Sequence, residues 1–176
     1  AVAAHPAVGR TLDTQAIYDY LYFHGIPAPR SLYQNVHKLL PGQFATLRNG
    51  RLDTGFYWHA DYAPAKPEFR GLLDEAVRAA DAPSTAAFLS GGTDSSTVVG
   101  ALTAARGAPV DTFSIGFDAS GFDEMEYARC AVERYASRAN EYYLKPADIV
   151  TAVPLIARAY DEPFGNASAV PAYFCA

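Results

Sequence analysis

The stretch TAAFLSGGTDSSTVVGALTAAR, residues 85–106, decides the fold that we expect. Its first five residues form a short apolar run, which predicts a buried strand ending at Leu89. Apolar residues then recur at helical spacing, which predicts a helix over about residues 95–106. The apolar face of that helix comprises Val98, Val99, Leu102 and Ala105. A glycine-rich loop between a strand and a helix lies at the carboxyl edge of a parallel sheet, where α/β proteins bind ligands.

The rest of the chain after residue 68 repeats this alternation. Two more strands are predicted at 109–117 (PVDTFSIGF) and 141–145 (EYYLK). Helices are predicted over about 69–80, 123–136 and 146–159, and from 168 onward. On the first of these helices the predicted apolar face comprises Leu72, Ala76 and Ala79 or Ala80. The alternation predicts an α/β fold, a Rossmann-like parallel sheet with helices on both faces.

Residues up to about 62 show a different pattern. A helix is predicted over about 13–24, with Asp13 as its N-cap, Gly25 as its stop and Leu21 on its apolar face. Further along, FATLR and RLDTGFYW flank Asn49-Gly50, a dipeptide typical of type I′ turns, which predicts a β-hairpin. We therefore expect a joining segment with a helix and a hairpin over 1–62, and a second domain over 63–176.

Composition narrows the class of protein. Of 176 residues, 50% are hydrophobic and 19% are charged, which is typical of a packed soluble protein. A net charge of -5 argues against a general nucleic-acid binder. No stretch approaches the ~20 apolar residues of a membrane helix. Cys130 and Cys175 form no metal-binding or disulfide pattern, so we expect buried thiols in a reducing cytoplasm.

The loop SGGTDSS, residues 90–96, has the composition of an anion-binding site. Gly91 and Gly92 let backbone N–H groups approach a ligand, and the following helix N-terminus adds unpaired donors and partial positive charge. Hydroxyl donors are added by Ser90, Ser95 and Ser96. A carboxylate among phosphates needs a cation beside it, so Asp94 is a candidate Mg²⁺ ligand. The alternative is a plain turn in which Asp94 or Ser95 is an ordinary N-cap.

This loop resembles SGGxDS, the pyrophosphate-binding loop of the N-type ATP pyrophosphatases. The segment PRSLYQNVHKLLPGQFATLRNGRLDTGFYW, residues 29–58, is similar to the one that joins the glutaminase and synthetase domains of glutamine-hydrolysing asparagine synthetases. FLSGGTDSS, TFSIGFD, FDEMEYAR and DEPFGNASAVPAY then follow in that family's order. The resemblance covers about residues 14–176 and implies an adenine nucleotide alpha-hydrolase-like fold, incomplete in this chain.

The resemblance implies roles for the loop and for its neighbours. ATP and its leaving pyrophosphate would be bound by Ser90, Gly91, Gly92, Asp94, Ser95 and Ser96. Asp94 would be the catalytic residue that holds Mg²⁺. The adenine site would comprise Leu89 and Ile115, with backbone groups near Ser114 and Gly116.

Two acidic pairs lie outside the loop. The resemblance places Asp161 and Glu162 near the acidic substrate or behind its site; the alternative is a helix stop before Pro163. Asp123 and Glu124 are expected to cap the helix that follows them.

The reaction that the resemblance implies is carbon–nitrogen ligation in asparagine biosynthesis. ATP and Mg²⁺ would activate a carboxylate, aspartate by default, as an acyl-adenylate, pyrophosphate would leave, and glutamine-derived ammonia would form the amide. The partners would be small molecules, without nucleic acid or membrane, and a homodimer is compatible with the family. The glutaminase nucleophile, an N-terminal cysteine, is missing, and the chain stops before a GEGxDE-like signature and its lysine. We therefore expect a partial chain that is inactive alone.

Three alternatives stay open. One is a non-catalytic nucleotide-binding module, which the intact SGGTDSS loop disfavours. Another is a relative that amidates or cyclises a different carboxylate. The third is a tRNA-modifying enzyme that shares the loop, which the acidic charge and the lack of paired cysteines disfavour. Thr93 stands where the family usually has Leu, and we expect nucleotide binding to survive this change because the loop acts mainly through its backbone.

Overall fold

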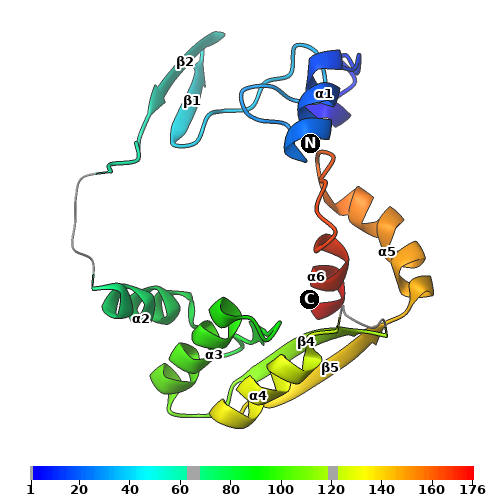
Figure 1. The fold of residues 1–176 in the computed structure, drawn as a ribbon. Coiled ribbons are helices and arrows are strands. Elements are labelled where there is room, and N and C mark those ends of the chain that lie inside the picture. Colours follow the sequence, from blue (N-terminus) through cyan, green and yellow to red (C-terminus); the bar gives the residue numbers. More distant parts are fainter. Residues whose placement is uncertain (1, 63–67, 119–122) are drawn as a thin grey trace. The chain divides into compact units, whose positions relative to one another are not determined.

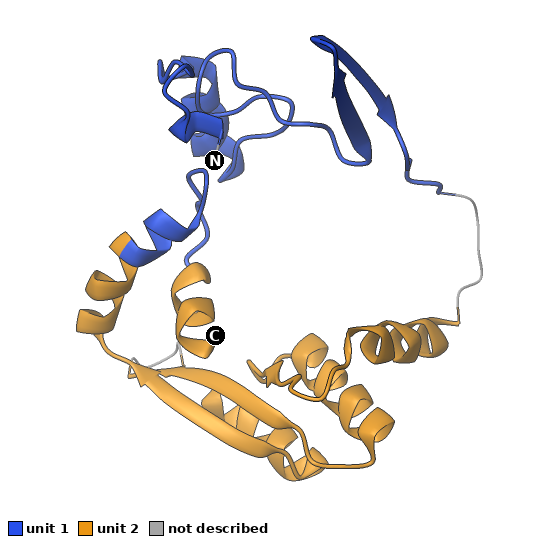
Figure 2. Cartoon of the chain, turned by 180° about the vertical axis from the view of Figure 1, so that it is seen from behind, with its two compact units in different colours: residues 1–64, 155–167 blue, residues 65–154, 168–176 orange. Residues whose placement is uncertain are grey.

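The computed structural model of this chain describes residues 2–62, 68–118 and 123–176. Its contacts divide the chain into two compact units (Figure 2). The first unit comprises Ala1–Pro64 and Leu155–Ala167, and the second comprises Ala65–Pro154 and Ser168–Ala176. The functional boundary between residues 62 and 63 stays a prediction. Within the described ranges, no helix is long and apolar enough to cross a membrane.

The second unit contains the predicted parallel sheet (Figure 1). Its strands lie in the order β3-β4-β5, with bounds Ala87–Phe88, Asp111–Phe117 and Arg138–Leu144. Thr112 of β4 lies between Ala87 of β3 and Ala139 of β5 in the register. Strand β3 is only two residues long, but Leu89 extends the pairing because its N–H donates to the Phe113 carbonyl at 2.9 Å. The α/β prediction is confirmed.

Helices surround this sheet. They are α2 (Phe69–Ala80), α3 (Thr93–Arg106), α4 (Met125–Tyr135), α5 (Pro146–Ala159) and α6 (Ala169–Cys175). Helices α4 and α6 both contact β4, and Figure 1 shows them on opposite sides of it. The α5 helix is shared between the two units.

A cluster of buried residues forms where α2, α3 and α4 meet one face of the sheet. Its members are Val77, Ala87, Leu89, Val99, Leu102, Val110, Met125, Ala128 and Ala131. Val99 and Leu102 confirm the predicted face of the glycine-loop helix, whereas Val98 and Ala105 are exposed. For α2 the predicted face was wrong, because Val77 and Leu73 pack into the cluster while Leu72 is 55% exposed. The position of α3 beside α2, which periodicity does not encode, selects the buried face.

The first unit holds α1 (Thr14–Phe23) and the hairpin strands β1 (Gln43–Arg48) and β2 (Arg51–Phe56). The Asp13 carboxylate accepts from the N–H of Gln15 at 2.9 Å, so the predicted N-cap is confirmed. The helix ends at Phe23 because His24, rather than Gly25, takes the left-handed conformation with φ 59°. Its buried residue is Ala16, whereas Leu21 is 71% exposed, so the predicted apolar face was also wrong here.

The hairpin follows its turn chemistry. Asn49 and Gly50 have φ values of 50° and 76°, and a type I′ turn requires positive φ at both positions. The six residue pairs between Gln43↔Phe56 and Arg48↔Arg51 are in register. The predicted hairpin is therefore confirmed.

An ion pair ties the end of α2 to the end of α3. Arg106 Nε donates to Asp81 Oδ1 at 2.9 Å, and Arg106 also donates to the carbonyl of Ala82 at 2.6 Å. Hydrogen bonding to Arg106, followed by the charge of its guanidinium, holds the pKa of Asp81 below its usual value. A carboxylate whose pKa is lowered on folding stabilises the folded state at neutral pH, and this contribution disappears in acid.

The cluster predicts unequal effects of two leucine truncations. Leu102 is 3% exposed, so Leu102→Ala removes buried methyl groups and should lower the free energy of unfolding by about 2–5 kcal/mol. Leu72→Ala on the neighbouring helix is the matched control, and it should cost less than about 1 kcal/mol. Urea unfolding followed by circular dichroism measures both. Equal losses in the two variants would contradict the packing described for α2 and α3.

The Asp81–Arg106 pair predicts a pH-dependent difference between the unaltered protein and Asp81→Asn. At pH 7 the unaltered protein should be the more stable, because its carboxylate is charged and paired. The difference should persist above the unfolded pKa of about 3.9 and shrink as pH falls through the lower folded pKa. Thermal unfolding of both proteins between pH 7 and pH 3 measures the difference. A gap that stays constant over this range would show that the pair contributes nothing.

Candidate functional site

The glycine-rich loop lies at the carboxyl end of β3, where the chain turns into α3. Helix α3 begins at Thr93, two residues earlier than predicted, and Gly92 is its N-cap, with φ -68° and ψ 164°. No side chain caps this helix end, so the alternative with Asp94 or Ser95 as an ordinary N-cap is excluded. The N–H groups of the first turn have no acceptor within the helix. They are therefore available to an anion, and the helix dipole favours negative charge at this point.

The loop serines hold the loop in shape. The hydroxyl oxygens of Ser90 and Ser95 lie 3.1 Å apart, and the Ser90 N–H donates to Ser95 Oγ at 3.3 Å. The Ser95 hydroxyl donates to the Gly92 carbonyl at 3.2 Å. Ser96 acts through its backbone, because its N–H makes the first helical bond to that same carbonyl at 3.1 Å. These bonds organise the loop.

Gly91 and Gly92 differ in whether the fold requires a residue without a side chain. Gly91 has φ +86°, and a Cβ there would lie 2.5 Å from the backbone nitrogen of Ala128 and 2.7 Å from Tyr127 Cβ. The first turn of α4 therefore passes directly against Gly91. A Cβ on Gly92 would meet only Ser90 Oγ, at 3.5 Å, which is ordinary contact. Packing against α4 explains Gly91, whereas no close contact within the protein requires a glycine at position 92.

Asp94 is exposed in the first turn of α3. A negative side chain at a helix N-terminus is stabilised by the dipole. Among the described residues, no three His, Cys, Asp or Glu side chains gather into a metal site. Mg²⁺ commonly takes only one or two protein carboxylates and completes its shell with phosphate oxygens and water. A single exposed carboxylate, Asp94, at a helix N-terminus is compatible with that donor set.

A cavity of about 280 Å³ adjoins the loop in the second unit. It lies between α6 and the β4 face that carries Phe113, Ile115 and Phe117. Its remaining lining residues are Phe88, Leu89, Ser90, Glu124, Ser168, Pro171, Ala172 and Cys175. The structure therefore brings the loop and a largely apolar cavity together at one sheet edge.

Only two of the four predicted adenine residues line this cavity. Leu89 and Ile115 do, whereas Ser114 and Gly116 do not. Side chains alternate along a strand, and the buried Ser114 hydroxyl donates to the Leu89 carbonyl at 2.7 Å. Gly116 lies under the ring of Tyr143, whose Cε1 a Cβ would approach to 2.6 Å. The sequence could have indicated two of the missed lining residues. Phe113 and Phe117 alternate with Ile115 along one strand, so the three share a face.

The remaining predicted residues lie elsewhere or act differently. Asp161 and Glu162 belong to the first unit, whereas the loop belongs to the second. Glu162 Oε2 pairs with Lys38 Nζ at 2.6 Å. Asp123 does not cap α4 as predicted; its carboxylate accepts from the Phe117 N–H at 3.3 Å. Glu124 is the N-cap residue of α4 but makes no side-chain cap hydrogen bond, so the expected position is confirmed for Glu124 and wrong for Asp123.

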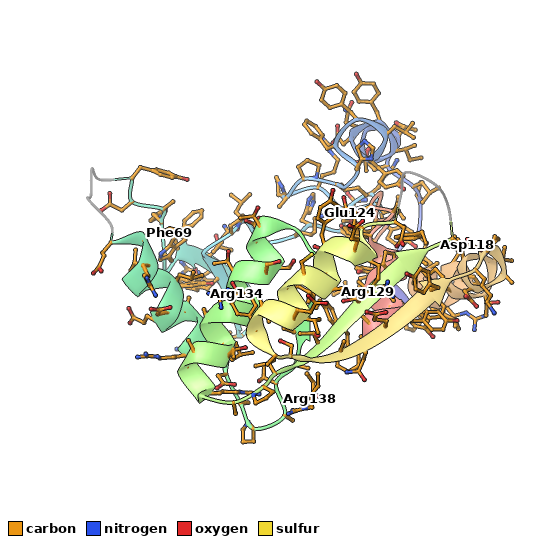
Figure 3. All side chains as sticks on the ribbon, turned by 60° about the horizontal axis from the view of Figure 1, so that its bottom comes forward. Phe69, Asp118, Glu124, Arg129, Arg134 and Arg138 are labelled. Atoms are coloured by element: carbon orange, nitrogen blue, oxygen red, sulfur yellow. The ribbon has the colours of Figure 1, made fainter. Side chains whose placement is uncertain are left out.

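Charged and polar side chains fasten α4 to β5 near this edge. Arg129 projects from α4 (Figure 3). Its guanidinium donates two hydrogen bonds, of 3.0 Å and 2.6 Å, to the carboxylate of Glu141 in β5. The hydrogen bonds to Glu141 raise the pKa of Arg129 above its usual value. Burial raises the pKa of the Cys175 thiol, which keeps that cavity-lining side chain neutral. This agrees with the expected plain thiol at Cys175, whereas Cys130 is exposed rather than buried.

Comparison with known proteins matches both regions of the chain. Residues 68–176 match the family described as asparagine synthase, and residues 1–58 match the glutamine amidotransferase domain. The chain is 34% identical over 175 residues to a protein of Methanocaldococcus jannaschii provisionally named glutamine-hydrolyzing asparagine synthetase 2. It is 29% identical over 176 residues to glutamine-hydrolyzing asparagine synthetase 1 of Bacillus subtilis.

These matches cover 92% and 94% of the chain but 34% and 28% of the two relatives. The chain thus spans about a third of the length of the curated relatives it matches. The asparagine synthase match itself includes the glycine-rich loop and the cavity beside it. The chain belongs to the asparagine synthase family.

Proposed function

We propose that this chain is part of an ATP-dependent ligase that forms an amide from a carboxylate and ammonia. The carboxylate oxygen attacks the α-phosphorus of ATP, so that pyrophosphate leaves and an acyl-adenylate forms. Ammonia then attacks the acyl carbon, AMP leaves with the oxygen, and a proton is released. The observation that carries the proposal is the uncapped N-terminus of α3 at Gly92, next to an apolar-lined cavity of about 280 Å³.

The loop's part is to bind and orient the phosphates. The free N–H groups of the first turn of α3 would donate to phosphate oxygens, and the hydrogen bond between Ser90 and Ser95 holds the turn in place. A Mg²⁺ ion, when bound, neutralises phosphate charge and makes pyrophosphate a better leaving group. Asp94 would hold that ion from the helix side. Such preorganised charge stabilisation is the largest contribution to many enzymatic rates.

The cavity's part is to hold the base. Leu89 and Ile115 would offer apolar contacts to a planar ring, and Ser90 belongs both to the cavity lining and to the loop. For Ser114 and Gly116 we propose only that their backbone groups lie at the edge of the adenine site. This arrangement supports ATP rather than a ligand without a base.

The names of the relatives suggest which compound donates nitrogen and which carboxylate accepts it. Their names describe glutamine-hydrolyzing asparagine synthetases, and residues 1–58 match a glutamine amidotransferase domain. We therefore propose aspartate as the acceptor and ammonia from glutamine as the nucleophile. For Asp161 we still propose a position near the acidic substrate or behind its site. Glu162 is held by Lys38, so we place it outside the binding site.

The overall proposal is tested with protein expressed from its complete reading frame. With ATP, Mg²⁺, ammonium and aspartate labelled with ¹⁸O in its side-chain carboxylate, it should release pyrophosphate and AMP in equal amounts, and the label should appear in AMP. A non-catalytic nucleotide-binding module would bind ATP without release. A cyclising relative would release pyrophosphate with another carboxylate and without ammonium.

Asp94→Ala should lower pyrophosphate release by about a hundredfold or more, because one charge-stabilising group at the phosphates is lost. The dependence on Mg²⁺ concentration should shift upward in the same assay. Glu75→Ala, which removes an exposed carboxylate from the middle of α2, is the control and should leave both unchanged. Pyrophosphate release at the unaltered rate in Asp94→Ala would overturn the metal assignment.

The two loop glycines should separate stability from ligand binding. Gly91→Ala should lower the free energy of unfolding by about 1–3 kcal/mol, because φ +86° and the α4 backbone both oppose a Cβ. Gly92→Ala should change it by less than about 0.5 kcal/mol. Its methyl group should nevertheless slow pyrophosphate release by about a hundredfold, the scale expected when reacting groups are displaced by about 1 Å. Normal release by a stable Gly92→Ala protein would show that no ligand approaches this glycine.

A further inference from the structure

Glu124 is an acidic residue beside the candidate nucleotide site that the phosphate loop itself does not use. It occupies the N-cap position of α4, but its side chain makes no cap hydrogen bond. Figure 3 shows it at the start of that helix, ahead of Arg129. The residue is exposed and lines the cavity beside the loop. Its carboxylate is therefore placed to meet a ligand in that cavity.

The cavity is otherwise lined by uncharged groups. Among its described lining residues, Glu124 carries the one formal charge, and Ser90 and Ser168 supply hydroxyl groups. The other lining side chains are aromatic, aliphatic, a proline or the neutral thiol of Cys175. A few polar groups in an apolar cavity fix the orientation of the ligand. We therefore expect the Glu124 carboxylate to meet a hydrogen-bond donor of the ligand.

The path of α4 places Glu124 next to the phosphate loop as well. The Glu124 carbonyl accepts from the N–H groups of Tyr127 and Ala128 at 3.0 Å and 3.3 Å. These two residues pack against Gly91 of the loop, where a Cβ would lie 2.5 Å from the Ala128 nitrogen. Glu124 is thus one helical turn away from the contact with the loop, and it also lines the cavity. It is near both the site proposed for the phosphates and the site proposed for the base.

The ribose of a nucleotide joins the base to the phosphates, so it lies where these two sites meet. Its hydroxyl groups are hydrogen-bond donors, and an ionised carboxylate accepts hydrogen bonds with both oxygens. Phosphates, by contrast, are anions that a carboxylate repels. An acidic side chain binds a ribose hydroxyl in the same way in dinucleotide-binding folds.

The amino group of adenine is also a donor. It lies at the edge of the base that points away from the ribose, and therefore away from the loop. Of the three parts of a nucleotide, the ribose fits the position of Glu124 best.

We propose that the Glu124 carboxylate binds the ribose of ATP by accepting hydrogen bonds from its hydroxyl groups, and so selects ribonucleotides over deoxyribonucleotides. This inference rests on the proposed function, because it takes the loop and the cavity as two ends of one nucleotide site. It assigns a specificity-determining residue to α4, outside the glycine-rich loop. Glu124 contributes to nucleotide binding and takes no part in the bonds that form and break.

The test measures nucleotide dissociation constants by titration calorimetry, with Mg²⁺ and protein expressed from its complete reading frame. The nucleotides are ATP, 2′-deoxy-ATP and 3′-deoxy-ATP. The unaltered protein should bind ATP about tenfold or more tightly than at least one deoxynucleotide, the factor expected for one hydrogen bond to a charged group. Glu124→Ala should weaken ATP binding about tenfold and change binding of that deoxynucleotide by less than about twofold, so the preference should disappear.

Two further variants separate ribose binding from general effects of charge. Glu126→Ala is the matched control, because Glu126 is an exposed acidic residue in the first turn of the same helix and is not among the described lining residues of the cavity. It should keep the full preference for ATP. Glu124→Gln keeps one acceptor oxygen without the charge, so it should retain part of the preference.

Three results would overturn the proposal. Equal losses for ATP and both deoxynucleotides in Glu124→Ala would place the carboxylate at the phosphates or their metal ion. An unchanged preference in that variant would show that Glu124 does not contact the ribose. A loss seen with ATP but not with purine riboside triphosphate, which lacks the amino group, would assign Glu124 to the base.

The same titrations keep this inference separate from the proposed function. If the unaltered protein binds ATP but releases no pyrophosphate, the proposed function is rejected. The preference between ATP and the deoxynucleotides would still show whether Glu124 binds the ribose.

Discussion

The close approach between Gly91 and the first turn of α4 determines how the second unit is built. A left-handed φ of +86° turns the chain sharply out of β3, and the missing side chain lets the Ala128 backbone pass at a distance no Cβ would tolerate. The loop is therefore held between its own strand and a helix from later in the sequence. This contact places the N-terminus of α3 at the sheet edge, and the serine hydrogen bonds then keep its N–H donors in place.

Different residues of one loop serve its shape and the proposed binding. Gly91 and Ser95 hold the loop, whereas a Cβ on Gly92 would meet only Ser90 Oγ and Asp94 is exposed in the first turn of α3. An uncapped helix end is a cost that soluble proteins usually remove with a side chain. Leaving it uncapped is favourable when a phosphate takes the place of the cap, since backbone donors then need no reorganisation when the ligand arrives.

In the first unit, single residues also make two contacts each, here with segments far apart in the chain. One lysine, Lys38, contacts a neighbouring carbonyl and a carboxylate 124 residues away. His24 ends α1 and at the same time pairs with Gly165. The family matches place these partners in different functional regions, so the contacts that complete one compact unit are also contacts between regions.

Local patterns determined the elements of this protein. Periodicity and turn chemistry predicted the strand–loop–helix unit, the Asn49-Gly50 hairpin and the Asp13 cap, because each depends on neighbours within a few residues. Only the tertiary structure decided which helix faces are buried: Val77 rather than Leu72 is in the core because α3 lies beside it. It also decided that Ser114 faces away from the cavity and that Glu162 binds Lys38. Both contacts join groups far apart in the sequence. They arise from packing, so no periodic pattern in the sequence predicts them.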